Sequence, residues 1–250
     1  MRRLKAVVAY DGTNYAGWQI QPDRISVQSE VERAIREITG ETARIFCSGR
    51  TDTGVHAIGQ VIHFDLAGKK IPAAKLFRAL NSKLPPDIRM LKITRAKPDF
   101  EARYGATGKE YRYFIFNGPQ IPPHRRLYAA HVFRPLDVKA MRTAAAMLEG
   151  THDFAAFSAN PGHERETVRT IFSLRVKKSR GEITLVVRGN GVLYKMVRSL
   201  AGFLIRVGTG ELPPDAAKKI LESKERTARV PTGHACGLFL WKVFYAPARR

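Results

Sequence analysis

Apolar side chains along the first hundred residues follow two patterns, one typical of strands and one typical of helices. Residues 4–10 form an apolar run typical of a buried strand, and the run ends at the turn signal Asp11-Gly12. Between residues 26 and 39 apolar side chains return every three or four positions until Gly40, which predicts an amphipathic helix. The other elements expected here are strands at 44–47, 60–65 and 87–96 and a second helix that starts at Pro72.

The second half of the chain shows the same order of elements. Residues 109–116 predict a strand rich in aromatic side chains, and a proline-rich connection follows. Asp137 is expected to cap a helix that Gly150 stops. The remaining elements expected are a hairpin of 167–178 and 182–189, helices at 193–207 and 215–222, and a strand at 238–245.

This order of elements predicts an α+β fold. Each half reads strand, helix, strand, strand, helix, strand, which is the ferredoxin-like (βαββαβ) pattern with mainly antiparallel sheets. The boundary is expected near residues 104–108, so residues 1–105 form an N-terminal α+β half and residues 106–250 a C-terminal α+β half. We expect a basic active-site cleft between the two halves.

The charge balance indicates the kind of partner. Lysine and arginine number 43 against 22 acidic residues, which gives a net charge of +21 and a pI near 10.4. Such a surplus favours a polyanion, most simply a nucleic acid, although basic surfaces can also serve solubility alone. The basic side chains expected around the cleft, of which some only face solvent, are Arg2, Arg3, Lys5, Arg125, Arg126, Lys177, Lys178, Arg180, Lys195 and Arg198.

Composition also bears on the compartment. No apolar run reaches the roughly eighteen residues that a membrane span needs. The N-terminal apolar segment ends at Asp11, which is too short for a signal peptide, and no small-residue cleavage site follows. The two cysteines, Cys47 and Cys236, have no paired spacing, which disfavours a disulfide framework and a zinc site. We expect a cytoplasmic protein without a membrane partner.

One stretch concentrates residues that carry chemistry. Residues 48–56 read Ser-Gly-Arg-Thr-Asp-Thr-Gly-Val-His between two predicted strands, so they form a loop. Arg50 precedes Asp52 by two positions and could orient this carboxylate and keep it ionised. The alternative is a plain turn in which Thr51 and Asp52 hydrogen-bond their own backbone. The local residues leave both interpretations open.

Other classes of protein fit the sequence less well. Asp-Thr-Gly also occurs in aspartic proteases, but these need two such aspartates and only one is present. His56 and His63 are not spaced as metal ligands, and phosphate-loop motifs are absent from the sequence. A non-catalytic RNA-binding module remains an alternative, because Tyr111, Tyr113 and Phe114 could stack on bases. The usual aromatic signature of such modules is missing.

Four stretches together identify a family. Residues 49–57 resemble the Gly-Arg-Thr-Asp-x-Gly-Val-His-Ala motif of the tRNA pseudouridine synthase A (TruA) family. The resemblance extends to residues 10–19, 109–113 and 189–198, so it covers nearly the whole chain in the family's order. Two positions depart from the pattern, because Thr53 is often alanine and Lys195 often histidine; neither replaces a reacting group.

The resemblance implies an activity. The family isomerises uridine to pseudouridine at positions 38, 39 and 40 in the anticodon stem-loop of tRNA. It uses no cofactor or metal and acts as a homodimer. A related enzyme acting on another RNA site is a second possibility that the motifs allow.

The resemblance also implies roles for four residues. Asp52 falls on the family's catalytic aspartate, and Tyr111 on the tyrosine that contacts the target base. Arg198 falls on the arginine paired with the aspartate, and Arg50 on the loop arginine that holds the place of the flipped nucleotide. A carboxylate can act as a nucleophile or as a base at the sugar, and the sequence does not choose between these two roles for Asp52.

Overall fold

A computed structural model describes residues 1–68, 71–164 and 166–246. The chain divides into two compact units, which we call unit 1 (Met1–Thr107 with Leu240–Arg250) and unit 2 (Gly108–Phe239). The halves expected from the sequence, 1–105 and 106–250, differ from these units in the last strand. Its residues from Leu240 on group with unit 1, because a terminal strand is placed by long-range pairing that no local pattern encodes. The α+β class is confirmed.

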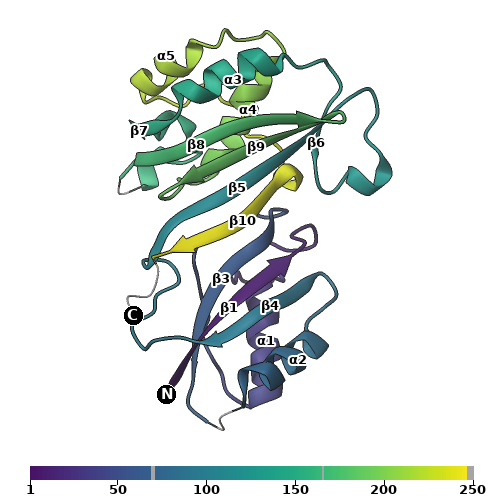
Figure 1. Ribbon diagram of the computed structural model, residues 1–250, viewed down its shortest axis with the longest axis vertical. Helices are drawn as coiled ribbons and strands as arrows, with labels where there is room; N and C mark the ends of the chain where they lie inside the picture. Colours follow the sequence, from purple (N-terminus) through teal and green to yellow (C-terminus); the bar gives the residue numbers. More distant parts are fainter. Residues whose placement is uncertain (69–70, 165, 247–250) are drawn as a thin grey trace. The chain divides into compact units, whose positions relative to one another are not determined.

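Unit 1 has the ferredoxin-like arrangement. Its strands are ordered β4-β1-β3, with β2 also paired to β3, and the pairs among these four strands are antiparallel. Helices α1 and α2 pack on one another, and α2 lies against β4. The elements of unit 1 are β1 (Arg2–Tyr10), α1 (Val27–Thr39), β2 (Phe46–Cys47), β3 (His56–Leu66), α2 (Ala73–Lys83), β4 (Ile88–Arg95) and, from Leu240 on, β10 (Leu238–Tyr245). All of them except the short β2 are labelled in Figure 1.

The predicted apolar periods account for the core of unit 1. Leu4, Ala6 and Val8 of β1 are buried while their neighbours are only partly covered, as a period of two requires. Val31 and Ile35 lie one turn apart on α1 and are fully buried. Each large apolar side chain buried in this way contributes roughly 1.5–3 kcal/mol, so the buried faces of β1 and α1 stabilise the unit.

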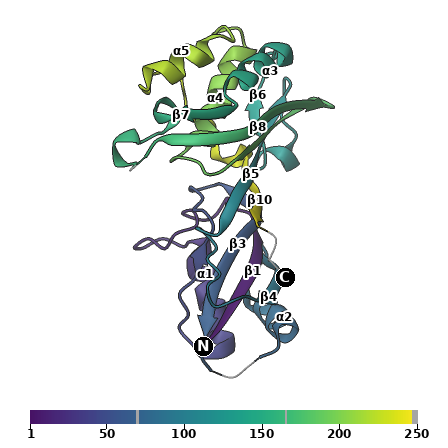
Figure 2. The same ribbon diagram turned by 60° about the vertical axis from the view of Figure 1, so that its left-hand side comes forward.

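Unit 2 is built around a set of antiparallel strand pairs. Its strands run in the order β5-β9-β8-β7, and β6 adds to β5 in parallel. In both views α3, α4 and α5 lie together on one side of β8 and β9 (Figure 1, Figure 2). The elements are β5 (Ala106–Asn117), β6 (Ala130–Val132), α3 (Val138–Met147), β7 (Gly150–Asp153), β8 (Val168–Ser179), β9 (Glu182–Gly189), α4 (Met196–Gly208) and α5 (Ala216–Ser223).

The predicted hairpin and helix cap of unit 2 are confirmed. Ser179 pairs with Glu182 across a two-residue turn, whose residues Arg180 and Gly181 have φ angles of 47° and 80°. Positive φ at both central positions matches the right-handed twist of a hairpin. Asp137 accepts hydrogen bonds from the first backbone N–H groups of α3, at 2.8 and 3.0 Å. Local signals therefore specify these two sites correctly.

Three details of unit 2 differ from the expectation. The connection after β5 contains β6, and the chain after α3 contains β7; the sequence predicted neither strand. Both are four residues or shorter, so they carry no readable period and depend on their partners. Helix α4 begins at Met196 rather than at residue 193, because Lys195 has a φ of 56° and cannot belong to the helix.

Among the described residues, none of the helices combines the length and apolar character of a membrane span.

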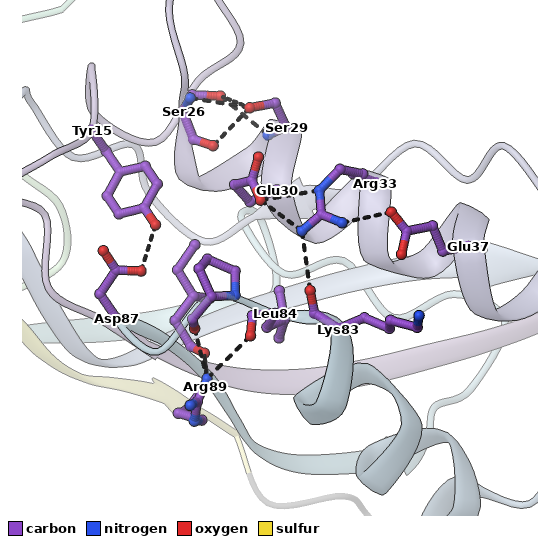
Figure 3. Close-up of polar contacts among 12 residues, drawn as sticks. Tyr15, Ser26, Ser29, Glu30, Arg33, Glu37, Lys83, Leu84, Asp87 and Arg89 are labelled. Atoms are coloured by element: carbon purple, nitrogen blue, oxygen red, sulfur yellow. Dashed lines mark hydrogen bonds and ion pairs between the residues drawn. The ribbon is translucent and has the colours of Figure 1, made fainter.

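The start of α1 is fixed by a reciprocal pair of serines. The Ser26 hydroxyl accepts from the Ser29 backbone N–H at 3.1 Å, and the Ser29 hydroxyl accepts from the Ser26 N–H at 3.1 Å (Figure 3). Further along α1, Arg33 bonds Glu30, Glu37 and the carbonyl oxygen of Lys83 at the end of α2. The serine pair satisfies two helix-terminal donors, so it determines where the helix begins.

Replacing Ser26 by alanine is expected to lower the free energy of unfolding by about 1 kcal/mol, because the first turn of α1 loses its side-chain cap. Urea-induced unfolding measures the change. The matched control is Ser82→Ala, since this exposed hydroxyl bonds only the Ala79 carbonyl within α2 and its loss should be close to neutral. Equal losses from the two variants would contradict the capping role.

Candidate active site

The loop that carries Asp52 is anchored where it leaves β2. The buried Ser48 donates its backbone N–H to the Val61 carbonyl at 2.8 Å and its hydroxyl to Gln60 Oε1 at 2.8 Å. The Gln60 amide nitrogen in turn donates to the Gly49 carbonyl at 2.6 Å. Both side chains are fully buried, so these bonds form away from competing water. They fix the entry to the loop on the adjacent strand β3.

The middle of the loop is held through Thr51. Its hydroxyl lies 2.7 Å from the Tyr10 hydroxyl, and its carbonyl accepts from the Trp18 backbone N–H at 3.0 Å. The rings of Tyr10 and Trp18 contact each other with centroids 5.9 Å apart, and both side chains are buried. The first two sequence motifs, residues 10–19 and 49–57, are therefore two sides of one packed contact.

The exit of the loop is held by a histidine and a close backbone approach. The Gly12 N–H lies 3.1 Å from His56 Nδ1, and the same ring nitrogen lies 3.0 Å from Asp11 Oδ1. The Val55 N–H donates to the Asp52 carbonyl at 3.1 Å and closes a turn. A Cβ atom on Gly12 would lie 2.0 Å from the Val55 carbonyl oxygen. Only glycine allows this approach.

These contacts show how the loop is held. It does contain a turn, but the Thr51 hydroxyl bonds Tyr10 rather than its own backbone. The Asp52 side chain is half-exposed at the surface of unit 1. Arg50 is exposed and forms no hydrogen bond or ion pair with the residues that the structure describes. The direct pairing of Arg50 with Asp52 that the local sequence allowed is therefore not formed.

A second layer supports the segment that precedes Trp18. The Tyr15 hydroxyl donates to Asp87 Oδ1 at 2.5 Å (Figure 3), and the Asp11 N–H donates to the Asp87 carbonyl at 2.9 Å. Burial, and then the Asp87 carboxylate, raise the pKa of Tyr15 well above its usual value. The phenol therefore stays protonated and donates to Asp87 at any physiological pH. Residues 11–18 are thus tied to the start of β4.

The other two predicted site residues lie in unit 2. Tyr111 is buried on β5, opposite Val187 of β9. Arg198 lies in the first turn of α4, where its Nε donates to the Gly233 carbonyl at 2.8 Å, and the Gly233 N–H donates back to the Arg198 carbonyl at 2.9 Å. Within unit 2 the guanidinium of Arg198 is thus oriented by the backbone at Gly233.

The aromatic strand β5 has one covered face and one open face. Tyr113 is fully buried on the same face as Tyr111, and its hydroxyl donates to the His234 carbonyl at 3.0 Å. Burial raises the pKa of Tyr113 above its usual value. Glu110 and Arg112 lie on the opposite face and form an ion pair at 2.9 Å. Tyr113 is therefore a core residue, and the idea that it stacks on a base is wrong.

A comparison with protein families identifies the family of this chain. A family model described as tRNA pseudouridine synthase matches residues 6–105 and 144–246, about four-fifths of the chain. The chain belongs to the tRNA pseudouridine synthase family. This membership confirms the resemblance that the four sequence motifs indicated.

Similar proteins of the same family cover the chain from end to end. The tRNA pseudouridine synthase A of Brevibacillus brevis is 45% identical over 245 residues, which is 98% of this chain and 100% of that protein. The protein of the same name from Shouchella clausii is 46% identical over 98% of this chain and 94% of its own. A solved structure of a Cbf5-Nop10-Gar1 complex aligns with a TM-score of 0.33 and 15% identity over 80% of this chain and 54% of that one, which is too weak a likeness to support an argument.

Sequence reasoning singled out Asp52 but missed the residues that hold its loop. Tyr10, Trp18 and His56 lie in the quoted motifs without an assigned role, and Ser48 and Gln60 also received none. The residues joined by these side-chain hydrogen bonds are separated by 11 to 44 positions. The sequence holds one indication that Tyr10 is buried beside a loop. This tyrosine is the last member of the apolar run that ends before residue 11.

The close approach at Gly17 yields a stability prediction. Gly17 has a φ of +85°, and a Cβ there would lie 2.6 Å from the Thr51 carbonyl oxygen. Gly40 is a matched control, since it has a φ of +73° but nothing within 4 Å of its Cβ position. Gly40→Ala is expected to cost roughly 1–2 kcal/mol of backbone strain. Gly17→Ala is expected to cost at least about 1 kcal/mol more, because the added methyl is overpacked against backbone.

Urea unfolding of both variants measures the difference. A Gly17→Ala protein that loses no more stability than the Gly40→Ala protein would show that the backbone of residues 51–53 moves freely, against the packed contact described above.

Proposed function

We propose that this protein isomerises uridine to pseudouridine in tRNA and that Asp52 is its catalytic residue. The observation that carries the proposal is the position of Asp52 in a chain of the tRNA pseudouridine synthase family. Its carboxylate is half-exposed, while the loop around it is fixed on both sides by buried hydrogen bonds. The relatives named tRNA pseudouridine synthase A support tRNA as the substrate.

The reaction needs a group at the sugar or the base. The bond between C1′ and N1 breaks, uracil turns, and a bond between C1′ and C5 forms; the proton on C5 leaves and N1 gains a proton. A carboxylate can promote the first step by attacking the sugar or ring as a nucleophile. It can equally act as a base that takes a proton from the sugar. Both routes place the Asp52 carboxylate against the same nucleotide.

Access to the target uridine requires its extrusion from the RNA stack. Extrusion costs a few kcal/mol of stacking and pairing. We propose that Arg50 offsets part of this cost by taking the place of the flipped nucleotide. Two observations support that role: its side chain is exposed, and within the described chain it has no competing ion pair. A planar guanidinium can stack on bases and bond phosphate at the same time.

Tyr111 and Arg198 complete the proposed chemistry. We propose that Tyr111 contacts the target uracil and that Arg198 pairs with Asp52 during the reaction. The support for both roles is family membership together with the matching motifs. An arginine opposite a carboxylate keeps it ionised when bound RNA excludes water from it.

The finer assignment of substrate and assembly is part of the same proposal. We propose positions 38, 39 and 40 of the anticodon stem-loop as the targets, a homodimer as the active form and the cytoplasm as the compartment. The net charge of +21 supports binding of a folded polyanion such as tRNA. A synthase for another RNA site would make pseudouridine elsewhere, and an RNA-binding module would make none.

Asp52→Asn is expected to reduce pseudouridine formation in unmodified tRNA by at least about a thousandfold, because an amide is neither nucleophile nor base. Chemical mapping of pseudouridine at positions 38, 39 and 40 measures the product. The matched control is Asp23→Asn, an exposed aspartate of unit 1 with a φ of 55° that asparagine also tolerates.

The two readouts separate the possible outcomes. Wild type should modify tRNA, Asp23→Asn should match it, and Asp52→Asn should bind tRNA without converting it. Substantial turnover by Asp52→Asn would remove Asp52 from the mechanism. Absence of product from wild type on any RNA would leave only the binding-module alternative.

Binding of tRNA is expected to weaken steeply with salt. Each phosphate that a lysine or arginine contacts releases counterions, which adds somewhat less than one unit to the slope of log affinity against log salt. With contacts to several phosphates, affinity should fall at least about tenfold between 50 and 200 mM salt. Fluorescence anisotropy of labelled tRNA measures the slope. A slope near zero would contradict a phosphate-dominated interface.

A further inference from the structure

We propose that the hydroxyl groups of Tyr10 and Thr51 act as a positioning device for Asp52, with Tyr10 as a positioning residue. The proposal rests on the proposed function, since it assumes that Asp52 performs the chemistry. It assigns a task to a hydrogen bond that joins two motifs 41 positions apart in the chain.

Hydrogen bonds hold the backbone on both sides of Asp52, and we call this set of bonds the clamp. Thr51 immediately precedes Asp52 and is only 9% exposed. Its side chain is held by the Tyr10 hydroxyl at 2.7 Å, and its carbonyl by the Trp18 N–H at 3.0 Å. The next carbonyl, that of Asp52, accepts from the Val55 N–H at 3.1 Å. The backbone on both sides of Asp52 is therefore bonded to fixed groups.

Tyr10 is a rigid anchor for this clamp. It is the last residue of β1, which lies between β3 and β4, and it pairs with Ala57 on one side and Ile88 on the other. The register along β3 shifts between Val8 and Tyr10, so the strand is irregular just where Tyr10 meets the loop. Irregularities of this kind often re-aim a side chain beside an active site.

Catalysis by a carboxylate is sensitive to such positioning. A displacement of about 1 Å from the reactive geometry can lower a rate about a hundredfold. Without the hydrogen bond between the Tyr10 and Thr51 hydroxyls, the Asp52 carboxylate would still be able to react. The backbone beside it would lose one of the bonds that fix its position. The expected signature is a lower kcat with an unchanged affinity for tRNA, because neither Tyr10 nor Thr51 is exposed to the substrate.

The experiment removes each hydroxyl without changing the shape of the side chain. Tyr10→Phe and Thr51→Val are expected to lower kcat for pseudouridine formation about ten- to a hundredfold, with the tRNA Kd within twofold of wild type. Thr51→Ser keeps the hydroxyl and should restore most of the activity. The matched control is Tyr245→Phe, which removes another tyrosine hydrogen bond of 2.7 Å, to Ala102, in the same unit.

The double variant separates positioning from plain stability. Each single variant removes one of the two groups in the buried Tyr10–Thr51 hydrogen bond, which lowers Tm; replacing both groups by apolar ones of the same shape is closer to neutral. We therefore expect the Tm of Tyr10→Phe/Thr51→Val to return toward wild type while its kcat stays as low as in the single variants. Activity that rises together with Tm in the double variant would overturn the proposal.

Two further outcomes are equally decisive. If wild type converts tRNA and both single variants keep kcat within twofold, the positioning role is disproved while the proposed function stands. If wild type makes no pseudouridine, the proposed function fails instead. Hydrogen exchange of the Trp18 amide, which donates to Thr51, tests the clamp without any activity: exchange should quicken in Tyr10→Phe but not in Tyr245→Phe, and equal exchange in wild type and Tyr10→Phe would overturn the proposal.

Discussion

The close backbone approach between residues 12–17 and residues 51–55 is the constraint on which the candidate site depends. At both Gly12 and Gly17 an added Cβ would meet a carbonyl oxygen of the loop at 2.6 Å or less. Because the two segments touch through their backbones, the loop cannot move without the segment before α1. This explains in physical terms why two motifs far apart in sequence occur together: they form the two sides of one contact.

Local patterns were sufficient for the elements that stabilise themselves locally. The cap at Asp137 and the turn at Arg180-Gly181 depend on residues within three positions of one another, and both were predicted. Strands β6 and β7 were not, because each is held only by a neighbour elsewhere in the chain. The strand from Leu240 on had a clear pattern, yet its place in unit 1 is a matter of pairing.

The residues of the candidate site also differ in whether a local pattern could predict them. Family resemblance pointed to Asp52, since this residue lies inside a contiguous motif. Local chemistry suggested Arg50 as its support, because charge attraction between neighbours is the simplest inference from a short sequence. The structure uses other groups instead: the hydroxyl of Tyr10 and the ring of His56 hold the chain around Asp52. The partners in these buried hydrogen bonds are distant in the sequence and cannot be read from spacing.

The surplus of positive charge then has a separate task from the rigid loop. Even if each of the 22 acidic residues neutralised one base, 21 of the 43 lysines and arginines would remain. That field attracts any RNA, because phosphate contacts position a nucleic acid but carry little sequence information. Under the proposed function, the choice of a uridine would then fall to parts of the chain that keep a fixed conformation. A loop held at Ser48, Thr51 and His56 has that property, so the loop and the positive charge would serve complementary tasks.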